Sequence, residues 1–331
     1  MTTQLDWFGC ATFRLKTAGL TVFLDAYIDR VPGADGREGA SADDISECDF
    51  ILIGHSHFDH IWGAECIALR TGAPIIGSYE TIRIMAAAGV PDHQLWPVSG
   101  GETIPLGHGV RVEVYPALHA CNWADYDDQD PEFSCIGGMH VDYLERRIAE
   151  KTMLDGLGSL SADLATHMAR SDQGGRGDGG TLCFIIDTPD GRLFFRDTPG
   201  RWTGITERLS ADVGILAASG RANTDGEPIQ GSLVNFLTED VRMLGLKRAI
   251  ICHHDAWLGP VFARGNFKEI RAGMTRRMPD CDVVELDYDK SYPVFAEIDS
   301  LTHKESLDKR RNRGGQRPDS AQITKPKFTG H

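Results

Sequence analysis

The sequence predicts an α/β protein with mixed β-sheets, and three observations support this prediction. Short apolar runs that suit buried strands alternate with helix-like patterns in both halves of the 331-residue chain. A strong hairpin signal, the turn segment 188–191 (Thr-Pro-Asp-Gly), joins two apolar runs in the second half. The hydrophobic share is 41% and the charged share 25%, which is ordinary for a globular chain.

In the first half, the elements are short and closely spaced. Two helical patterns fit 61–72 and 79–89, and Val90-Pro91 and Gly100-Gly101 mark turns between elements. The apolar runs that predict strands are 4–8, 11–15, 20–25, 50–54, 74–77 and 110–117.

The second half repeats the alternation of strands and helices. It opens with the hairpin, whose arms are 181–187 and 192–196. The remaining predicted elements are a buried strand at 213–218, a helix at 232–244, a strand at 248–252, a helix at 267–278 and a strand at 282–286.

Between residues 121 and 180 the pattern weakens. Residues 125–130 are acidic, and 174–180 is a glycine-rich run that suits a flexible segment. We interpret 121–180 as an insertion and a candidate lid, because loops on a rigid scaffold often carry specificity. The alternative is a surface excursion with no role. The rest of 1–302 is expected to form a single domain.

The net charge of −14 is unevenly distributed. Segment 303–331 holds eight Lys or Arg and three Asp or Glu, which gives +5 and leaves −19 for the rest (−14 minus +5). An acidic body repels phosphate backbones and argues against nonspecific nucleic-acid binding. The basic segment has almost no apolar content and is predicted to be a disordered tail, either idle or bound to an anionic partner.

The sequence favours a cytoplasmic protein. No apolar stretch is long enough to span a bilayer, and residues 1–6 lack the features of a signal peptide. The sequence is compatible with a homo-oligomer. The eight cysteines, which suit reduced thiols because none forms a C-x-x-C pair, are at 10, 48, 66, 121, 135, 183, 252 and 281.

The strongest functional signal is the segment 55–60 (His-Ser-His-Phe-Asp-His), which follows the apolar run 50–54. Imidazole and carboxylate together suit zinc, iron, manganese or nickel. In extended backbone His55 and His57 point the same way and can bind one ion. Asp59 and His60 lie where the chain turns toward a helix and can face a second ion. The alternative is a solvated loop that happens to be rich in histidine.

This His-x-His-x-Asp-His pattern after an apolar strand resembles the signature of the metallo-β-lactamase superfamily of metal-dependent hydrolases. Residues 5–15 and 19–26 resemble the paired opening strands of that fold. They look most like the branch with ascorbate-6-phosphate lactonase and N-acylphosphatidylethanolamine phospholipase D. The resemblance spans most of residues 4–290 and implies a four-layer αββα sandwich, with two mixed sheets face to face and helices outside.

The resemblance also implies a dinuclear metal site. His119 follows the strand 110–117 and suits the first ion with His55 and His57. Asp197 follows the hairpin, where the family has an aspartate that bridges both ions; the alternative is an Asp that caps the turn. His253 follows the strand 248–252 and suits the second ion with Asp59 and His60, with His254 as the alternative ligand.

Five further residues are candidates for substrate contact or for orienting a ligand. Arg221 could clamp a carboxylate or phosphate, although arginines also commonly brace turns. These five are His254, Asp255, Arg221, Asn223 and Trp202.

The leading functional prediction is a dinuclear metal-dependent hydrolase that acts on a small ester, lactone or amide. Two divalent ions, Zn²⁺ first with Mn²⁺ or Fe²⁺ as alternatives, would activate a water to hydroxide, and Asp59 would orient it as the catalytic residue. The alternatives are a phosphodiesterase of the same fold, an iron-dependent oxidoreductase, and a nonenzymatic metal- or partner-binding protein.

Overall fold

The computed structural model describes residues 2–127, 129–159, 162–171, 179–259 and 261–296. Met1–Phe295 forms one compact unit, and Ala296–His331 is assigned to a second. The predicted domain end at 302 and the predicted basic tail 303–331 lie outside the described residues. Within the described part of the chain, none of the helices combines the length and apolar character needed to cross a membrane.

The first sheet has seven strands in the order β17-β1-β2-β3-β4-β5-β6. Neighbours are antiparallel from β17 to β3 and parallel from β3 to β6. The strands are β1 (Gln4–Gly9), β2 (Thr12–Thr17), β3 (Leu20–Leu24), β4 (Phe50–Leu52), β5 (Ile75–Ser78), β6 (Leu95–Val98) and β17 (Ser291–Pro293).

The second sheet also has seven strands, in the order β16-β15-β12-β10-β9-β8-β7. Neighbours are antiparallel from β7 to β10 and parallel from β10 to β16. The strands are β7 (Thr103–Gly107), β8 (Val110–Pro116), β9 (Leu182–Thr188), β10 (Gly191–Arg196), β12 (Val213–Ala217), β15 (Arg248–Cys252) and β16 (Asp282–Val284).

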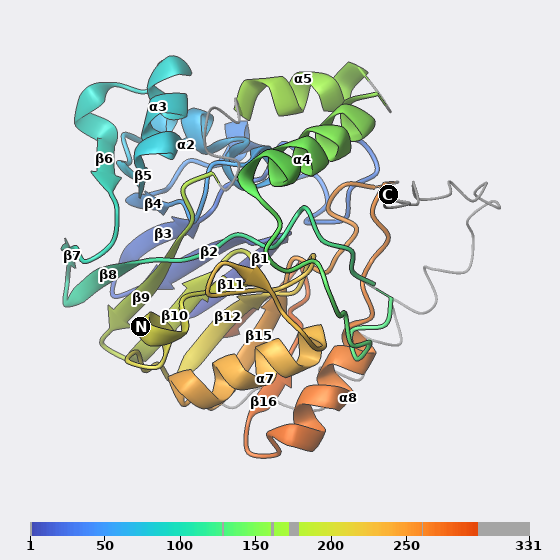
Figure 1. The fold of residues 1–331 in the computed structure, drawn as a ribbon. Coiled ribbons are helices and arrows are strands. Elements are labelled where there is room, and N and C mark those ends of the chain that lie inside the picture. Colours follow the sequence, from blue (N-terminus) through green and yellow to red (C-terminus); the bar gives the residue numbers. More distant parts are fainter. Residues whose placement is uncertain (1, 128, 160–161, 172–178, 260, 297–331) are drawn as a thin grey trace. The chain divides into compact units, whose positions relative to one another are not determined.

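Helices cover the outer faces of these sheets. Figure 1 shows α2 and α3 on one side of the molecule and α7 and α8 on the other, with the strands between them. The helices are α1 (Phe58–Ile61), α2 (Ala64–Thr71), α3 (Tyr79–Ala87), α4 (Tyr143–Gly158), α5 (Ala162–Ser171), α6 (Thr203–Thr206), α7 (Leu233–Leu244) and α8 (Phe267–Arg277). The predicted mixed-sheet α/β fold is therefore confirmed.

The hydrophobic pattern explains why each helix lies on its sheet. α7 has an apolar side that includes Phe236, Leu237 and Val241, all buried against the second sheet. The helix begins after Ser232, whose side chain accepts a hydrogen bond from the Asn235 N–H, and ends at a left-handed glycine. On the other side, residues of α2 and α3 bury against the first sheet.

Several short elements complete the fold. The smallest sheet holds β11 (Gly200–Arg201), β13 (Asn223–Thr224) and β14 (Glu227–Pro228). Two single turns of 3₁₀ helix span Ala42–Asp44 and Asp92–Gln94.

The predicted hairpin is present. Thr188 pairs with Gly191, so Pro189 and Asp190 form a two-residue loop between the antiparallel strands β9 and β10. This hairpin matters for the site because β10 runs directly into Asp197.

The region 121–180 contains two helices that the pattern did not predict. α4 begins with a capping box between Asp142 and Glu145, but none of its residues is buried. α5 packs beside it. Part of the glycine-rich run, residues 174–178, lies outside the described residues.

Candidate metal centre

Strand ends bring the predicted ligands together. His55 follows β4, His119 follows β8, Asp197 follows β10 and His253 follows β15. Asp59 and His60 lie in the four-residue helix α1, which starts directly after His57. Because these strands belong to both large sheets, the centre depends on the whole fold rather than on one segment.

Three histidines form a first donor group. His55 Nε2 lies 3.1 Å from His57 Nδ1. The His119 ring is 4.8 Å from the His55 ring and 4.6 Å from the His57 ring, between centroids. The donor atoms of all three lie within 4.8 Å of one another, a spacing that suits one ion.

Asp59, His60 and His253 form a second donor group. His253 Nε2 lies 3.2 Å from Asp59 Oδ2 and 3.3 Å from His60 Nε2. His60 Nε2 lies 3.4 Å from Asp59 Oδ2, which closes the triangle. Ligands about 2.0–2.1 Å from a tetrahedral ion would be about 3.4 Å apart, so these three atoms fit a metal such as zinc.

Asp197 lies between the two groups. Its Oδ2 is 2.6 Å from His55 Nδ1 and 3.4 Å from His60 Nδ1. Its Oδ1 is buried and, among the described residues, has no hydrogen-bond partner. A buried carboxylate oxygen without a partner is costly, and a cation would satisfy it. The close approach requires glycine at 54, because a Cβ there would lie 2.1 Å from Asp197 Oδ2.

The local electrostatics prepare the first group for a cation. Burial lowers the pKa of His55 well below its usual value, and the neighbouring His60 and His119 add to the shift. Burial likewise lowers the pKa of His119 to about 3. Both imidazoles are therefore neutral at pH 7 and offer a lone pair to a metal.

The second group carries charge. Burial disfavours ionisation of Asp59, but His60 and His253 outweigh it and hold the pKa of Asp59 well below its usual value. Burial also opposes the charged form of His60, yet Asp59 and Asp25 raise its pKa well above the usual value. A divalent ion on His60 Nε2 would replace the proton that these carboxylates stabilise.

Sequence reasoning missed two residues of the centre. Asp25 follows β3, and its Oδ2 lies 2.8 Å from His60 Nδ1 while its Oδ1 accepts a 2.9 Å hydrogen bond from the Gly54 N–H. Burial and the nearby Asp197 raise the pKa of Asp25 to about 8. A carboxylate at a strand end was a usable signal, the same one that led to Asp197.

Cys10 is the second missed residue. Its sulfur belongs to the donor group of Asp59, His60 and His253, with the four donor atoms within 4.8 Å of one another. Burial, with Asp59 and Asp255 nearby, raises the pKa of the Cys10 thiol well above its usual value. Nothing in the sequence signalled this position, because 242 residues separate Cys10 from His253.

The five candidate contact residues have different environments. Asn223 lines the cavity described below, and its Nδ2 donates to the His119 carbonyl at 2.9 Å. His254 Nε2 lies 2.7 Å from Glu285 Oε1, outside both donor groups. Asp255 Oδ2 accepts a hydrogen bond from the Cys10 N–H at 2.8 Å, directly behind the second group.

Arg221 and Trp202 belong to neither donor group, and their contact with a substrate stays a prediction. Arg221 Nη2 donates to the carbonyl oxygens of Gly137 and Ile229, so this buried side chain braces loops. Trp202 precedes α6 and is partly exposed. Neither is among the described residues that line the cavity.

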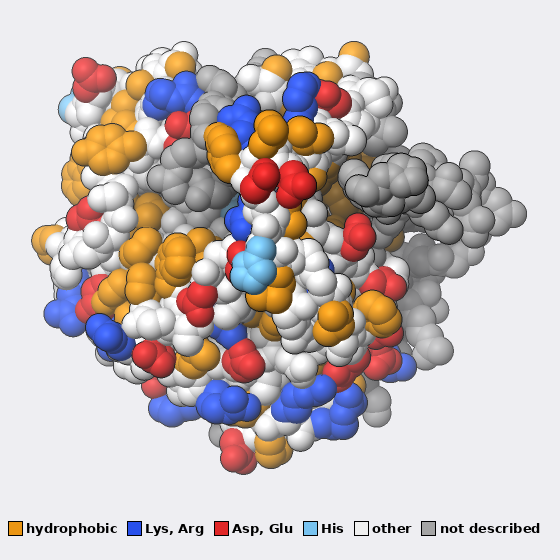
Figure 2. Space-filling view, in the orientation of Figure 1, with side chains coloured by type: hydrophobic (Ala, Val, Ile, Leu, Met, Phe, Trp, Pro, Cys, Tyr) orange, Lys and Arg blue, Asp and Glu red, His pale blue; other side chains and the backbone are white. Residues whose placement is uncertain are grey.

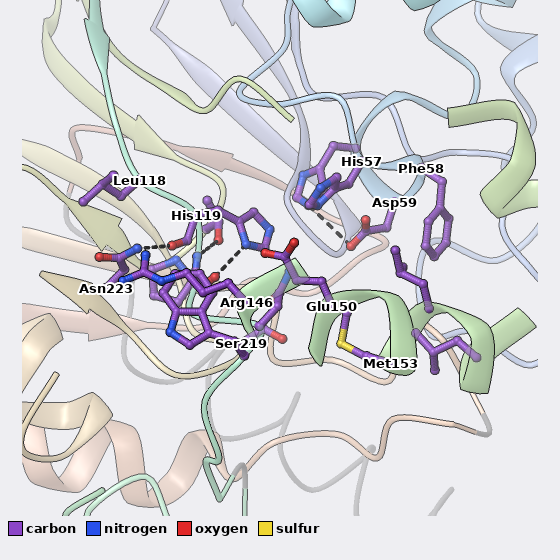
Figure 3. A pocket seen from close by; sticks show the side chains of 18 of the residues that line it. His57, Phe58, Asp59, Leu118, His119, Arg146, Glu150, Met153, Ser219 and Asn223 are labelled. Carbon is purple, nitrogen blue, oxygen red and sulfur yellow. Dashed lines mark hydrogen bonds and ion pairs between the residues drawn. The ribbon is translucent and has the colours of Figure 1, made fainter. Parts of the chain in front are cut away.

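A cavity of about 630 Å³ opens over both donor groups. Figure 3 shows His57, Asp59 and His119 facing Arg146, Glu150 and Met153 of α4 across it. The outer surface over α4 carries both hydrophobic and charged side chains (Figure 2). The helix α4 of the region 121–180 therefore contributes one wall of the cavity.

Comparisons with known proteins agree with the fold. Residues 21–172, somewhat under half of the chain, match the family model for the beta-lactamase superfamily domain. A UPF0173 metal-dependent hydrolase of Pyrobaculum calidifontis is 39% identical over 120 residues, which are 36% of this chain and 52% of that protein. The chain thus spans about half the length of the curated relatives it matches.

Solved structures extend the likeness over most of the chain. Igni18, a metallo hydrolase of Ignicoccus hospitalis, has a TM-score of 0.56 at 16% identity, over 88% of this chain and 98% of that one. CmlA, a diiron β-hydroxylase of Streptomyces venezuelae, has a TM-score of 0.54 at 14% identity, over 88% and 54%. These confirm the predicted fold, while the resemblance to the lactonase and phospholipase branch stays a prediction.

Proposed function

We propose that this chain, whose residues 21–172 match the beta-lactamase superfamily domain, is a hydrolase that uses two divalent metal ions. The observation that carries the proposal is the pair of buried donor groups joined by Asp197 beneath one cavity. The relatives named metal-dependent hydrolases support the same activity. Zinc is the first choice of metal, because imidazole and carboxylate donors at these spacings suit it.

Two divalent ions held by these residues would supply an activated water, because they would lower its pKa toward neutrality. The residues of this chain then position the reaction. Asp59 lines the cavity, and its charged carboxylate can accept a proton or a hydrogen bond from the attacking water. The His119 ring is oriented by its Nδ1, which donates to the Ala120 carbonyl oxygen, and the His60 ring by Asp25, whose Oδ2 lies 2.8 Å from His60 Nδ1. Asn223 holds the main chain of His119.

The cavity has two unlike ends, which supports a particular class of substrate. Beside Asp59 lies an apolar wall with Phe58, and the rings of Trp257 and Phe262 stack 5.0 Å apart. Beside His119 the lining includes polar groups, among them Asn223 and the Arg146 guanidinium, which lies 4.2 Å from the centroid of the Trp123 ring. A small ester, lactone or amide with one apolar part fits this arrangement.

The test is a substrate panel on protein purified without added metal, before and after chelation. Hydrolysis of esters, lactones or amides that disappears on chelation and returns with zinc is the expected result. Full activity in the metal-free preparation would reject the proposal. Turnover of bis-p-nitrophenyl phosphate alone would favour the phosphodiesterase. Bound iron with oxygen consumption would favour the iron-dependent oxidoreductase, and the fold relative CmlA is a diiron β-hydroxylase.

A further inference from the structure

Cys10 lies next to the second donor group, and the proposed function gives its thiol no role. The residue is fully buried and is not among the described residues that line the cavity. Its Sγ donates to the Asp59 carbonyl oxygen at 3.5 Å and lies 4.0 Å from Asp59 Oδ2. The sulfur therefore reaches the donor group from the protein interior and leaves the cavity side free.

The backbone of Cys10 is fixed on both sides. Its N–H donates to Asp255 Oδ2 at 2.8 Å, and its carbonyl oxygen accepts from the His253 N–H at 3.0 Å. The same carbonyl accepts from Trp7 Nε1 at 3.0 Å. Cys10 and His253 both have positive φ, of 49° and 58°, which is uncommon for residues other than glycine. The left-handed backbone of both residues and the direct hydrogen bond between them hold the Cys10 thiol and the His253 imidazole beside the same group of donor atoms.

We propose that Cys10 supplies a sulfur ligand to the ion held by Asp59, His60 and His253. This rests on the proposed function, because it assigns a fourth protein ligand to the second of the two ions. A zinc–sulfur bond is about 2.3 Å long, so the thiol must leave the Asp59 carbonyl and turn toward the three other donors.

The ligation step breaks the S–H bond of Cys10. The proton passes to solvent, and the sulfur electron pair forms the bond to the metal, so no oxidant or reductant takes part. A thiolate is a soft ligand and favours zinc or cobalt over manganese and magnesium. Cys10 thereby makes the second ion more zinc-selective than the first, whose described donors are three imidazoles and the shared carboxylate.

Cobalt(II) titration tests the assignment directly, because thiolate ligation produces an intense near-ultraviolet charge-transfer band. We expect the band in the wild-type protein and its loss in Cys10→Ser. We also expect the affinity for zinc of the site formed by Asp59, His60 and His253 to fall at least about tenfold in that variant, with a smaller change in the affinity for manganese. Cys281→Ser is the matched control, because Cys281 is also buried and free but lies in the core under α8. It should keep the band.

The outcomes separate this inference from the proposed function. Two bound ions without the band, or a band that persists in Cys10→Ser, would reject the sulfur ligand alone. One bound ion without the band would reject both proposals, and one ion with the band would keep Cys10 and reject the ion pair. X-ray absorption at the zinc edge of the wild-type protein reports the sulfur even if the variant does not fold.

Discussion

Asp25 is a positioning residue that holds a ligand without facing the cavity. Its two oxygens bind His60 Nδ1 and the Gly54 N–H, so it fixes both the ring and the strand end. In Asp25→Asn only one side-chain oxygen remains, so the amide cannot contact the Gly54 N–H and His60 Nδ1 with an oxygen each. We expect the affinity for the second ion to fall by about 10–100-fold, because such supporting partners typically have this effect. Competitive metal titration with a chromophoric chelator measures it.

Asp49→Asn is the control for Asp25. Asp49 Oδ2 accepts a hydrogen bond from the Thr21 N–H, also beside β3, but Asp49 belongs to neither donor group. The Asp49→Asn protein should bind both ions with wild-type affinity. An Asp25→Asn protein that did so too would show that Asp25 does not orient His60.

Gly54 provides the space into which Asp197 fits. In Gly54→Ala the new Cβ would lie 2.1 Å from Asp197 Oδ2, so the carboxylate must move away from His55 and His60. We expect loss of bound metal, and a free energy of unfolding lower by about 1–3 kcal/mol from overpacking. Elemental analysis and urea unfolding measure the two effects. Gly156→Ala, in open space within α4, should keep the metal.

His119 makes the stability of the metal-free chain depend on pH. Its pKa is about 3 in the folded chain and about 6.5 in an unfolded chain, so between these values only the unfolded chain binds the proton. Stability from this group is therefore lost as pH falls from about 7 toward 3. Urea denaturation at pH 7 and at pH 5 measures how much the free energy of unfolding changes between the two. This change should be smaller by about 1–2 kcal/mol in His119→Gln than in wild type. An equal difference in both proteins would contradict the shift.

At the scale of elements, a buried ion cluster ties β10 to α7. Asp240 accepts from Arg196, the residue before Asp197, and from Arg201 of β11, and all three side chains are buried. Asp240→Asn would leave the buried Arg196 guanidinium without the carboxylate that pairs with it, while Arg201 would keep its ion pair with Glu239 of α7. We expect a loss of about 3–5 kcal/mol in the free energy of unfolding, measured by urea denaturation.

Asp155→Asn is the surface control for this prediction. Asp155 pairs with Lys151 at 2.7 Å on the exposed part of α4, where such a pair adds little to stability. Similar losses in the free energy of unfolding in both variants would show that the cluster around Asp240 contributes no more than a surface ion pair.

The helices α4 and α7 should differ in local stability. α4 has no buried residue, whereas α7 buries seven residues, Phe236, Leu237 and Val241 among them. Because local opening of a helix costs mainly its tertiary contacts, amides of α4 should exchange far faster than those of α7. Hydrogen exchange followed by mass spectrometry tests this. Equal protection in the two helices would contradict a loosely held cavity wall.

The elements that the sequence predicted are those whose pattern reflects burial. β12 and β15 are buried throughout and form continuous apolar runs in the sequence. In the two large sheets, the strands that the pattern missed are β6, β7 and β17, which lie at sheet edges and each contain a proline. Proline suits an edge strand but weakens its signal in the sequence. α4 was missed because an unburied helix has no apolar face to detect.

The site follows the same logic. The cluster at 55–60 was visible because its members are adjacent in the sequence, and His119, Asp197 and His253 were visible as polar residues after apolar strands. Cys10 was not visible, because only the folded chain brings the N-terminal strands to His253. Arg221 could not be assigned from the sequence, because a loop arginine gives the same signal whether it meets a substrate or a carbonyl oxygen.

At the scale of the whole molecule, the two sheets act together. One sheet supplies His55 after β4, and the other supplies His119, Asp197 and His253 after three different strands. Neither sheet alone has a complete donor group, so assembly of the fold and metal binding should be coupled. Removing the metal is therefore expected to lower the melting temperature of the intact chain, which calorimetry before and after chelation would show. An unchanged melting temperature would indicate that the ions do not bind the folded state more tightly.

The most direct test of the account is the number of divalent ions per chain, measured by elemental analysis together with hydrolytic activity in the same samples. The account predicts about two ions in the wild-type protein and in the exposed-histidine control His93→Gln. It predicts fewer ions and parallel loss of activity in His57→Ala and Asp197→Ala. Two ions retained in these variants, or full activity in a metal-free preparation, would contradict it.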